Sequence, residues 1–391
     1  MNNFRFHIPT EVAFGKGVEI QTGSLAAKYG SRALIVYGKG SVVKSGLLAS
    51  VTESLKEAGL ACEEFGGAQP NPTLSHAEEG VKKALFFHAD IIIGVGGGST
   101  IDTAKAIAHG TANPMDSLWD IWTGIVPLNK SLPVGAVLTM PAAGSEMSNS
   151  AVLTNTEIGK KAGLGTELNR CRFAVMNPEW GATLPEYQLA AGVTDIMMHT
   201  MDRYFIPDSK CDLTDEIAEG LLRTVIKNGA IVVKNPLDYD AMAEIFWASS
   251  LSHNNLTECG RDKDFSVHKL GHPLSARYGV THGASLACVW GSWAETLYLD
   301  CLPRFAQYAR RVWDVQLTDD RLAAKKGIER TVAFFKSIGM PTSVLDLDIE
   351  ISEADVRQLA LDATNGDTLR LSKIRPLDAE DVEEIYLGAM V

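Results

Sequence analysis

The chain has 391 residues, of which 46% are hydrophobic and 21% charged, a composition that is typical of globular proteins and excludes disordered, collagenous and coiled-coil classes. Its 48 acidic and 36 basic residues give a net charge of −12 without a basic block, so the chain would repel a nucleic acid rather than bind it. A single hydrophobic core rarely grows beyond roughly 250–300 residues, so we expect two domains.

The N-terminus and the cysteines bear on cellular location. The first residues lack a basic stretch followed by an apolar run, and no window reaches the ~18 uninterrupted apolar residues that cross a bilayer. The six cysteines are scattered without a C-x-x-C pair, which is typical of free thiols in a reducing compartment. We therefore expect a cytoplasmic protein with no membrane partner, no disulfide framework and no thiolate zinc site.

Strand-like and helix-like segments alternate in the first half of the chain. The expected strands are 33–37, 89–95, 134–139 and 173–176, and the expected helices are 46–58, 74–87 and 100–109. The continuous apolar character of 89–95 is typical of a strand buried on both faces of a parallel sheet. This alternation predicts an open α/β sheet to about residue 180.

From Asn177-Pro178 onward, apolar residues recur at helical spacing and strand-like runs are nearly absent. The second half is therefore predicted to be helical. The expected helices are 186–204, 215–233, 239–252, 284–299, 304–315 and 323–338, with breaks at Pro207, Pro236, Pro273, Pro303 and Pro341.

A glycine-rich turn, Gly94-Val95-Gly96-Gly97-Gly98-Ser99, joins the apolar strand to the helix that follows it. Such a turn exposes backbone N–H groups at the positive end of a helix, where a pyrophosphate can approach closely. The strict G-x-G-x-x-G pattern fails at Ser99, and a glycine cluster after a strand is often only a tight turn. The residues alone leave nucleotide binding and a tight turn as alternatives.

Histidines and one aspartate recur at helical spacing in the second half. Asp195 and His199 are four residues apart, His268 and His272 repeat that spacing, and His282 opens another helix-like stretch. Three imidazoles with one carboxylate are a suitable shell for Fe²⁺ or Zn²⁺. The alternative is a set of partly buried histidines that bond to backbone carbonyls, because spacing alone does not bring them together.

A series of motifs extends along nearly the whole chain: Pro9 to Gly17, Pro70-Asn71-Pro72-Thr73, Gly96 to Lys105, Thr139 to Glu146, Asp195-x-x-x-His199, His268-x-x-x-His272-Pro273-Leu274 and Thr281-His282-Gly283. In this order they resemble the iron-containing (group III) alcohol dehydrogenase family. Within it, Tyr37-Gly38-Lys39-Gly40-Ser41 and Asp264-Phe265-Ser266-Val267-His268 are most similar to the butanol dehydrogenase branch of broad aldehyde reductases. Two segments depart from the family pattern, Met147-Ser148-Asn149 and Asn177-Pro178.

The resemblance implies a Rossmann-like α/β dinucleotide-binding domain over 1–182, an all-α metal-binding domain over 183–391, and a cleft between them. It also implies a homodimer. By motif match, the ligands of one divalent metal, Fe²⁺ or Zn²⁺, are Asp195, His199, His268 and His282, and His272 lies near the reacting carbon as the catalytic residue. The cofactor-binding residues implied by the match are Gly97, Gly98 and Ser99 for the pyrophosphate, Asp102 near it, and Asn71, Thr139, Lys161 and Leu184 for the adenosine or nicotinamide halves.

The loop after the first strand of the expected sheet favours NADP(H) over NAD(H). An acidic residue at this place usually binds the adenosine ribose hydroxyls, and there is no Asp or Glu between Ser31 and Val51. Instead Gly38, Lys39, Gly40 and Ser41 offer backbone donors, a cation and a hydroxyl that suit a 2′-phosphate. Lys39 can alternatively be a solvated loop residue.

We therefore expect a metal-dependent oxidoreductase that transfers a hydride between NADP(H) and a small-molecule primary alcohol or aldehyde, mainly as an aldehyde reductase. The first alternative is a metal- and NAD-dependent lyase similar to dehydroquinate synthase. The second alternative is a catalytically idle nucleotide-binding module. Net consumption of NADPH in the presence of aldehyde would distinguish the reductase from both.

Overall fold

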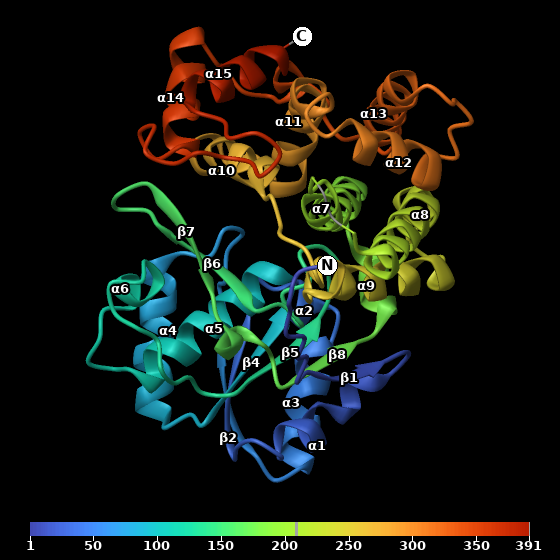
Figure 1. Cartoon of the computed structure of the whole chain (residues 1–391). Helices are drawn as coiled ribbons and strands as arrows, with labels where there is room; N and C mark the ends of the chain where they lie inside the picture. Colours follow the sequence, from blue (N-terminus) through green and yellow to red (C-terminus); the bar gives the residue numbers. More distant parts are fainter. Residues whose placement is uncertain (208–209, 391) are drawn as a thin grey trace. The chain divides into compact units, whose positions relative to one another are not determined.

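A parallel six-stranded sheet forms the centre of residues His7–Thr183 in the computed structural model, which describes residues 1–207 and 210–390 of the chain (Figure 1). Every pairing in this sheet is parallel, and the order is β1-β8-β5-β4-β2-β3. The predicted α/β class and parallel sheet are confirmed. The strands are β1 (Glu11–Phe14), β2 (Arg32–Tyr37), β3 (Ala61–Phe65), β4 (Ile91–Gly96), β5 (Val134–Leu138) and β8 (Phe173–Met176).

Helices cover this sheet on its apolar faces. The helices α1 (Thr22–Ala26) and α3 (Leu47–Glu57) share a hydrophobic cluster with β2 and β4 that contains Val51, Leu55 and Ile93. The other long helices of this unit, α4 (Leu74–Phe87) and α5 (Gly98–Ala112), pack against each other, and α5 also packs on β4. The short helices are α2 (Ser41–Lys44) and α6 (Leu118–Trp122).

The chain changes direction across the sheet between β2 and β4. From β2 it continues to β3 on one side, whereas β4, β5 and β8 follow on the other side. Ligands of open α/β sheets bind at the carboxyl ends of the strands at such a switch point. The sheet therefore brings the two expected cofactor segments, Gly38–Ser41 after β2 and Gly97–Ser99 after β4, to one edge.

An antiparallel hairpin of β6 (Ser150–Asn155) and β7 (Lys160–Gly165) adds a second, two-stranded sheet that the sequence did not predict. Its second strand contains Lys160, Lys161 and two glycines, residue types that are depleted in strands. The hairpin is fixed by contacts with other segments, including the bond from the Thr154 N–H to the Pro72 carbonyl at 2.8 Å.

The remaining residues, Leu184–Val391 together with Met1–Phe6, form a second compact unit that is helical. The first domain was expected to begin at residue 1, but residues Met1–Phe6 group with the second unit. The Asn2 N–H donates a hydrogen bond to the Gly260 carbonyl of this unit at 2.7 Å. No helix of the described residues is long and apolar enough to cross a membrane. The helices are α7 (Glu186–Tyr204), α8 (Asp212–Lys234), α9 (Tyr239–His253), α10 (Ser266–Tyr278), α11 (His282–Leu297), α12 (Leu302–Trp313), α13 (Asp320–Ser337), α14 (Glu353–Ala363) and α15 (Ala379–Gly388).

The helix α10 corrects one expectation, because a break was expected at Pro273. The helix continues through this proline, which lies in its interior. A proline within a helix removes the N–H that would bond to the residue four positions earlier, here Lys269, and this costs stability. Packing of α10 against α11 and α14 and burial of Leu270 and Leu274 favour the helix nevertheless.

Candidate metal centre and cofactor turn

The helix α7 carries Asp195 and His199 inside the second unit. Every residue from Leu189 to Tyr204 is buried, so this helix is surrounded by protein on all sides. Asp195 and His199 are one turn apart, and the Asp195 Oδ1 lies 3.4 Å from the His199 Nε2. Burial on a rigid helix fixes the backbone positions of both side chains.

Two further helices bring histidines to the same carboxylate. His268 lies in the first turn of α10, and His282 is the first residue of α11. The start of α11 passes so close to α7 that a Cβ on Gly283 would lie 2.1 Å from the Ala191 carbonyl oxygen. Only glycine permits this approach, which explains the glycine after His282.

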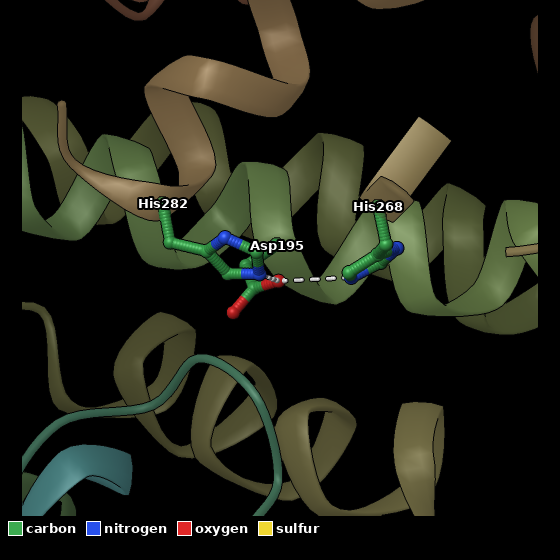
Figure 2. Close-up of side chains that lie close together, drawn as sticks. All are labelled: Asp195, His268 and His282. Atoms are coloured by element: carbon green, nitrogen blue, oxygen red, sulfur yellow. Dashed lines mark ion pairs between the residues drawn. The ribbon is translucent and has the colours of Figure 1, made fainter. Parts of the chain in front are cut away.

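The side chains of Asp195, His268 and His282 bring three donor atoms close together (Figure 2). The Nε2 atoms of His268 and His282 each lie 3.7 Å from the Asp195 Oδ1, and all three residues offer donor atoms within 4.8 Å of one another. A tetrahedral site with bonds of about 2.0–2.2 Å separates its donors by about 3.3–3.6 Å, so the arrangement fits one small cation. The distances are also too long for hydrogen bonds.

Burial and hydrogen bonding support the fit to a cation. Within the described ranges, Asp195 Oδ1 and His268 Nε2 are buried without a hydrogen-bond partner. An orphaned buried polar atom is costly, and a bound cation would satisfy both. The structure thus brings Asp195, His268 and His282 into one donor set, and His199, the fourth expected ligand, lies beside this set at 3.4 Å from Asp195.

The pKa values of His199 on α7 and His268 on α10 are shifted in opposite directions. Burial lowers the pKa of His199 well below its usual value, and the neighbouring His253 and His268 lower it further, which favours the neutral form that a metal ligand requires. Burial also lowers the pKa of His268, but the charges of Asp202 and Asp195 outweigh it and raise the pKa to about 9.

Two residues at this site were not singled out from the sequence. Asp202 bonds through Oδ2 to the Nδ1 of His268, and the ring of His253, the last residue of α9, stacks on that of His199. Asp202 is three residues after His199 on α7, so helical spacing could have indicated it. No spacing relates His253, on a separate helix, to the expected ligands.

His272, the expected catalytic residue, is half-buried one turn after His268 on α10. Its ring centroid lies 5.8 Å from that of His282. Neither His272 nor His199 is among the three residues whose donor atoms lie within 4.8 Å of one another, but His199 approaches Asp195 to 3.4 Å. The catalytic role of His272 therefore stays a prediction.

In the first unit, the glycine turn joins β4 to α5 at the carboxyl edge of the sheet. The helix begins at Gly98, so the N–H groups of Gly98 and Ser99 have no acceptor within the helix. A Cβ on Gly96 would lie 2.6 Å from the Thr100 hydroxyl, and one on Gly97 would lie 3.3 Å from the Met140 Cβ. At Gly98 the nearest atom would be 3.8 Å away, so protein packing alone does not require this glycine.

Asp102 and Lys105, on the same helix, hold the loop after β5. Asp102 accepts hydrogen bonds from the Ser145 hydroxyl (2.6 Å) and the Val152 N–H (2.9 Å), and it is buried. The fully buried Lys105 ammonium donates to the Ser145 and Ser150 carbonyls at 2.8 and 2.9 Å. Both carboxylate oxygens of Asp102 are therefore already used within the fold.

The unusual segment Met147-Ser148-Asn149 belongs to this loop. The Met147 carbonyl accepts from the Arg170 guanidinium at 2.8 Å, and the Asn149 carbonyl accepts from the Asn169 amide at 3.1 Å. The Ser148 hydroxyl accepts from the Ser150 N–H at 2.8 Å. Hydrogen bonds thus fix the whole segment in one conformation.

The other expected cofactor residues lie at several places. Lys39 is exposed after β2, between Gly38 and Gly40, and Ser41 begins α2. The Lys161 ammonium donates to the Asn71 side-chain oxygen at 2.9 Å, so these two residues are brought together.

The last two expected cofactor residues lie in different units. The Thr139 N–H donates to the Gly96 carbonyl at 3.0 Å and so supports the glycine turn. Leu184 is half-buried at the start of the second unit.

Both halves of the chain match known family models. Residues 9–178 match the family model "Iron-containing alcohol dehydrogenase", and residues 189–390 match "Fe-containing alcohol dehydrogenase family, C-terminal". The chain is 38% identical over 388 residues to NADH-dependent butanol dehydrogenase A of Clostridium acetobutylicum, with 99% of each chain covered. It is 35% identical over 356 residues to the NADPH-dependent aldehyde reductase YqhD of Escherichia coli, with 90% of each covered.

A solved structure gives the same result for the fold. The crystal structure of NADH-dependent butanol dehydrogenase A from Thermotoga maritima superposes with a TM-score of 0.95 at 32% identity, covering 100% of this chain and 99% of that one. These relatives favour neither the lyase nor the idle module. The family binds NAD(P) and a divalent metal. The chain belongs to the iron-containing alcohol dehydrogenase family and is an NAD(P)-dependent oxidoreductase of alcohols and aldehydes.

Proposed function

We propose that this enzyme works mainly as an NADPH-dependent aldehyde reductase, with one divalent metal held by Asp195, His199, His268 and His282. The observation that supports the metal site is the convergence of three imidazole Nε2 atoms at 3.4 to 3.7 Å from one carboxylate oxygen. Nitrogen and oxygen donors without sulfur suit Fe²⁺ and Zn²⁺. The set carries one negative charge, so it does not neutralise a divalent cation.

The chemistry divides between bound groups and the chain. When bound, the metal polarises the carbonyl oxygen of the substrate and the dihydronicotinamide supplies the hydride. The protein binds the metal through the four side chains and binds the pyrophosphate through the N–H groups of Gly98 and Ser99. Asp202 orients His268 through its second nitrogen.

His272 is the residue we propose for proton transfer. Reduction of an aldehyde consumes one hydride, which forms the new C–H bond, and one proton, which goes to the oxygen of the alcohol product. An imidazolium gives up a proton near neutral pH and recovers one from solvent. His272 is half-buried on α10 beside His282, a place that suits both exchanges.

The preference for NADPH rests on the loop after β2. Lys39 is exposed at the carboxyl edge of the sheet, so its ammonium is accessible to a phosphate. Ser41 adds a hydroxyl, and no carboxylate follows β2 before α3.

The expected homodimer remains a prediction, which light scattering of the protein in solution checks.

The test is a screen of aliphatic aldehydes with the purified, metal-analysed enzyme. NADPH and NADH are each supplied at equal concentration, and loss of the reduced cofactor is followed. The proposal expects aldehyde-dependent loss of NADPH, in proportion to bound metal, with a higher kcat/KM than for NADH. Turnover without bound metal would contradict the proposed site, and a higher kcat/KM with NADH would contradict the cofactor preference.

A further inference from the structure

We propose that His253 is a positioning residue of the metal centre, which fixes the ring of His199 by stacking. This inference rests on the proposed metal site. The two ring centroids are 3.9 Å apart with an interplanar angle of 22°. His253 ends α9, a helix that supplies none of the four expected ligands.

The two ligands His199 and His268 differ in how their rings are held. The Nδ1 of His268 bonds to Asp202, the arrangement by which proteins usually fix the tautomer and orientation of a ligand imidazole. The Nδ1 of His199 is buried and makes no hydrogen bond to any residue in the described part of the chain. Some other contact must therefore orient the ring of His199.

The torsion that needs this restraint is the rotation of the imidazole about its bond to Cβ. This torsion is broad for histidine, so a rigid helix does not by itself direct Nε2 toward Asp195. A flat ring stacked on the imidazole opposes such rotation, because rotation would drive one ring into the other. The 3.4 Å separation between His199 Nε2 and Asp195 Oδ1 depends on this orientation.

The other aromatic neighbours of His199 are less suited to this role. The His268 ring lies at 4.4 Å with a tilt of 33°, and the Phe265 ring lies at 6.0 Å with a tilt of 53°. The His253 ring is nearer and more nearly parallel than either. It therefore takes the part that Asp202 plays for His268.

The stacking role predicts which substitutions are tolerated. His253→Phe keeps a flat ring but removes both ring nitrogens. His253→Leu keeps an apolar side chain of similar bulk without a flat ring. His253→Ala removes the contact with the His199 ring altogether. We expect His253→Phe to bind Co²⁺ with wild-type affinity. We expect His253→Leu and His253→Ala to bind it roughly ten-fold or more weakly, the loss typical of removing an outer contact to a ligand.

The measurement is Co²⁺ affinity by competition with a chromogenic chelator, together with the visible spectrum of the bound Co²⁺, which reports ligand geometry without turnover. Thermal unfolding of each metal-free variant checks the fold, and His253→Leu replaces His253→Ala if the latter does not fold. Wild-type affinity in His253→Leu would overturn the inference. A loss in His253→Phe equal to that in His253→Leu would also overturn it, because a nitrogen and not the stack would then matter.

His268→Ala separates this inference from the metal site itself. If wild type binds Co²⁺ and His268→Ala does not, the metal site stands, and the His253 variants test stacking alone. If His268→Ala binds Co²⁺ as tightly as wild type, the proposed site fails, and the role of His253 fails with it.

Discussion

His268 and Asp202 are joined by a hydrogen bond between Nδ1 and Oδ2, which leaves the Nε2 of His268 directed at the carboxylate of Asp195. Both side chains are buried, and they belong to different helices, α10 and α7. The bond thus links the two helices at the point where the expected ligands meet.

Asp202→Asn should lower metal affinity by roughly 10- to 100-fold, because the amide removes the charge that raises the basicity of His268. Chelator competition with Zn²⁺ measures this. Asp362→Asn is the matched control, because Asp362 pairs with Arg277 at the far end of α10 on the surface. Equal affinities for wild type and Asp202→Asn would show that this bond does not support a metal ligand.

The glycine turn should be sensitive to a side chain at Gly98 only when cofactor is bound. Gly98→Ala fits the protein without a close contact, so we expect a normal fold and normal metal content. Its Cβ would cover N–H donors, and we expect the KM for NADPH to rise roughly ten-fold, as for the loss of one hydrogen bond to a charged group. Gly97→Val should also raise this KM, but its Cβ meets Met140 at 3.3 Å and disturbs the protein as well. An unchanged KM in Gly98→Ala would make the turn merely structural.

Lys39→Ala should lower kcat/KM for NADPH roughly ten-fold or more and leave NADH nearly unchanged, since a hydrogen bond to a charged group contributes ~1.5–3 kcal/mol. Steady-state kinetics with both cofactors measure the two values. Lys56→Ala is the control, because this exposed lysine lies at the C-terminal end of α3, before the start of β3. Equal losses with both cofactors would contradict recognition of the 2′-phosphate by Lys39.

Stability should fall in acid because of His109, which is fully buried between the Ser131 hydroxyl and the Asn169 side-chain oxygen. Burial lowers its pKa from 6.5 to about 4. At pH values between 6.5 and about 4, His109 is protonated in the unfolded chain but not in the folded chain. The free energy of unfolding therefore decreases as the pH falls through this range, by about 3 kcal/mol in total. Urea unfolding at pH 7 and pH 5 measures the part that is lost by pH 5, about 2 kcal/mol.

The variant His109→Gln cannot take up this proton, so its unfolding free energy should change less between the two pH values. His88→Asn, at an exposed histidine, should retain the wild-type pH dependence. A wild-type pH dependence in His109→Gln would assign the acid sensitivity to other groups.

Local sequence patterns were sufficient for much of the fold. The apolar run before Gly96 predicted a buried parallel strand, and α4 and α7 have the expected bounds, because helical periodicity is continuous through them. Patterns failed where contacts between distant segments decide the structure. Pro273 lies inside a helix, and the β6-β7 hairpin forms from a lysine- and glycine-rich segment.

In the candidate site, too, some residues were predictable from local spacing and others were not. Asp195 and His199 were visible as a helical pair, and His268 and His282 were candidates from the same spacing argument. The family motifs then assigned these four residues as ligands. Asp202 lay within reach of the same spacing argument but offers no distinctive motif. His253 was beyond sequence reasoning, since only the packing of α9 on α7 brings its ring to His199.

The most direct test of the metal centre is metal content and aldehyde reduction in His268→Ala and His282→Ala, compared with wild type. Each helix is held by its own apolar face, so both variants should remain folded. We predict that both lose most of the bound divalent metal and all aldehyde-dependent NADPH consumption. Full metal content with normal turnover in both variants would contradict the assignment.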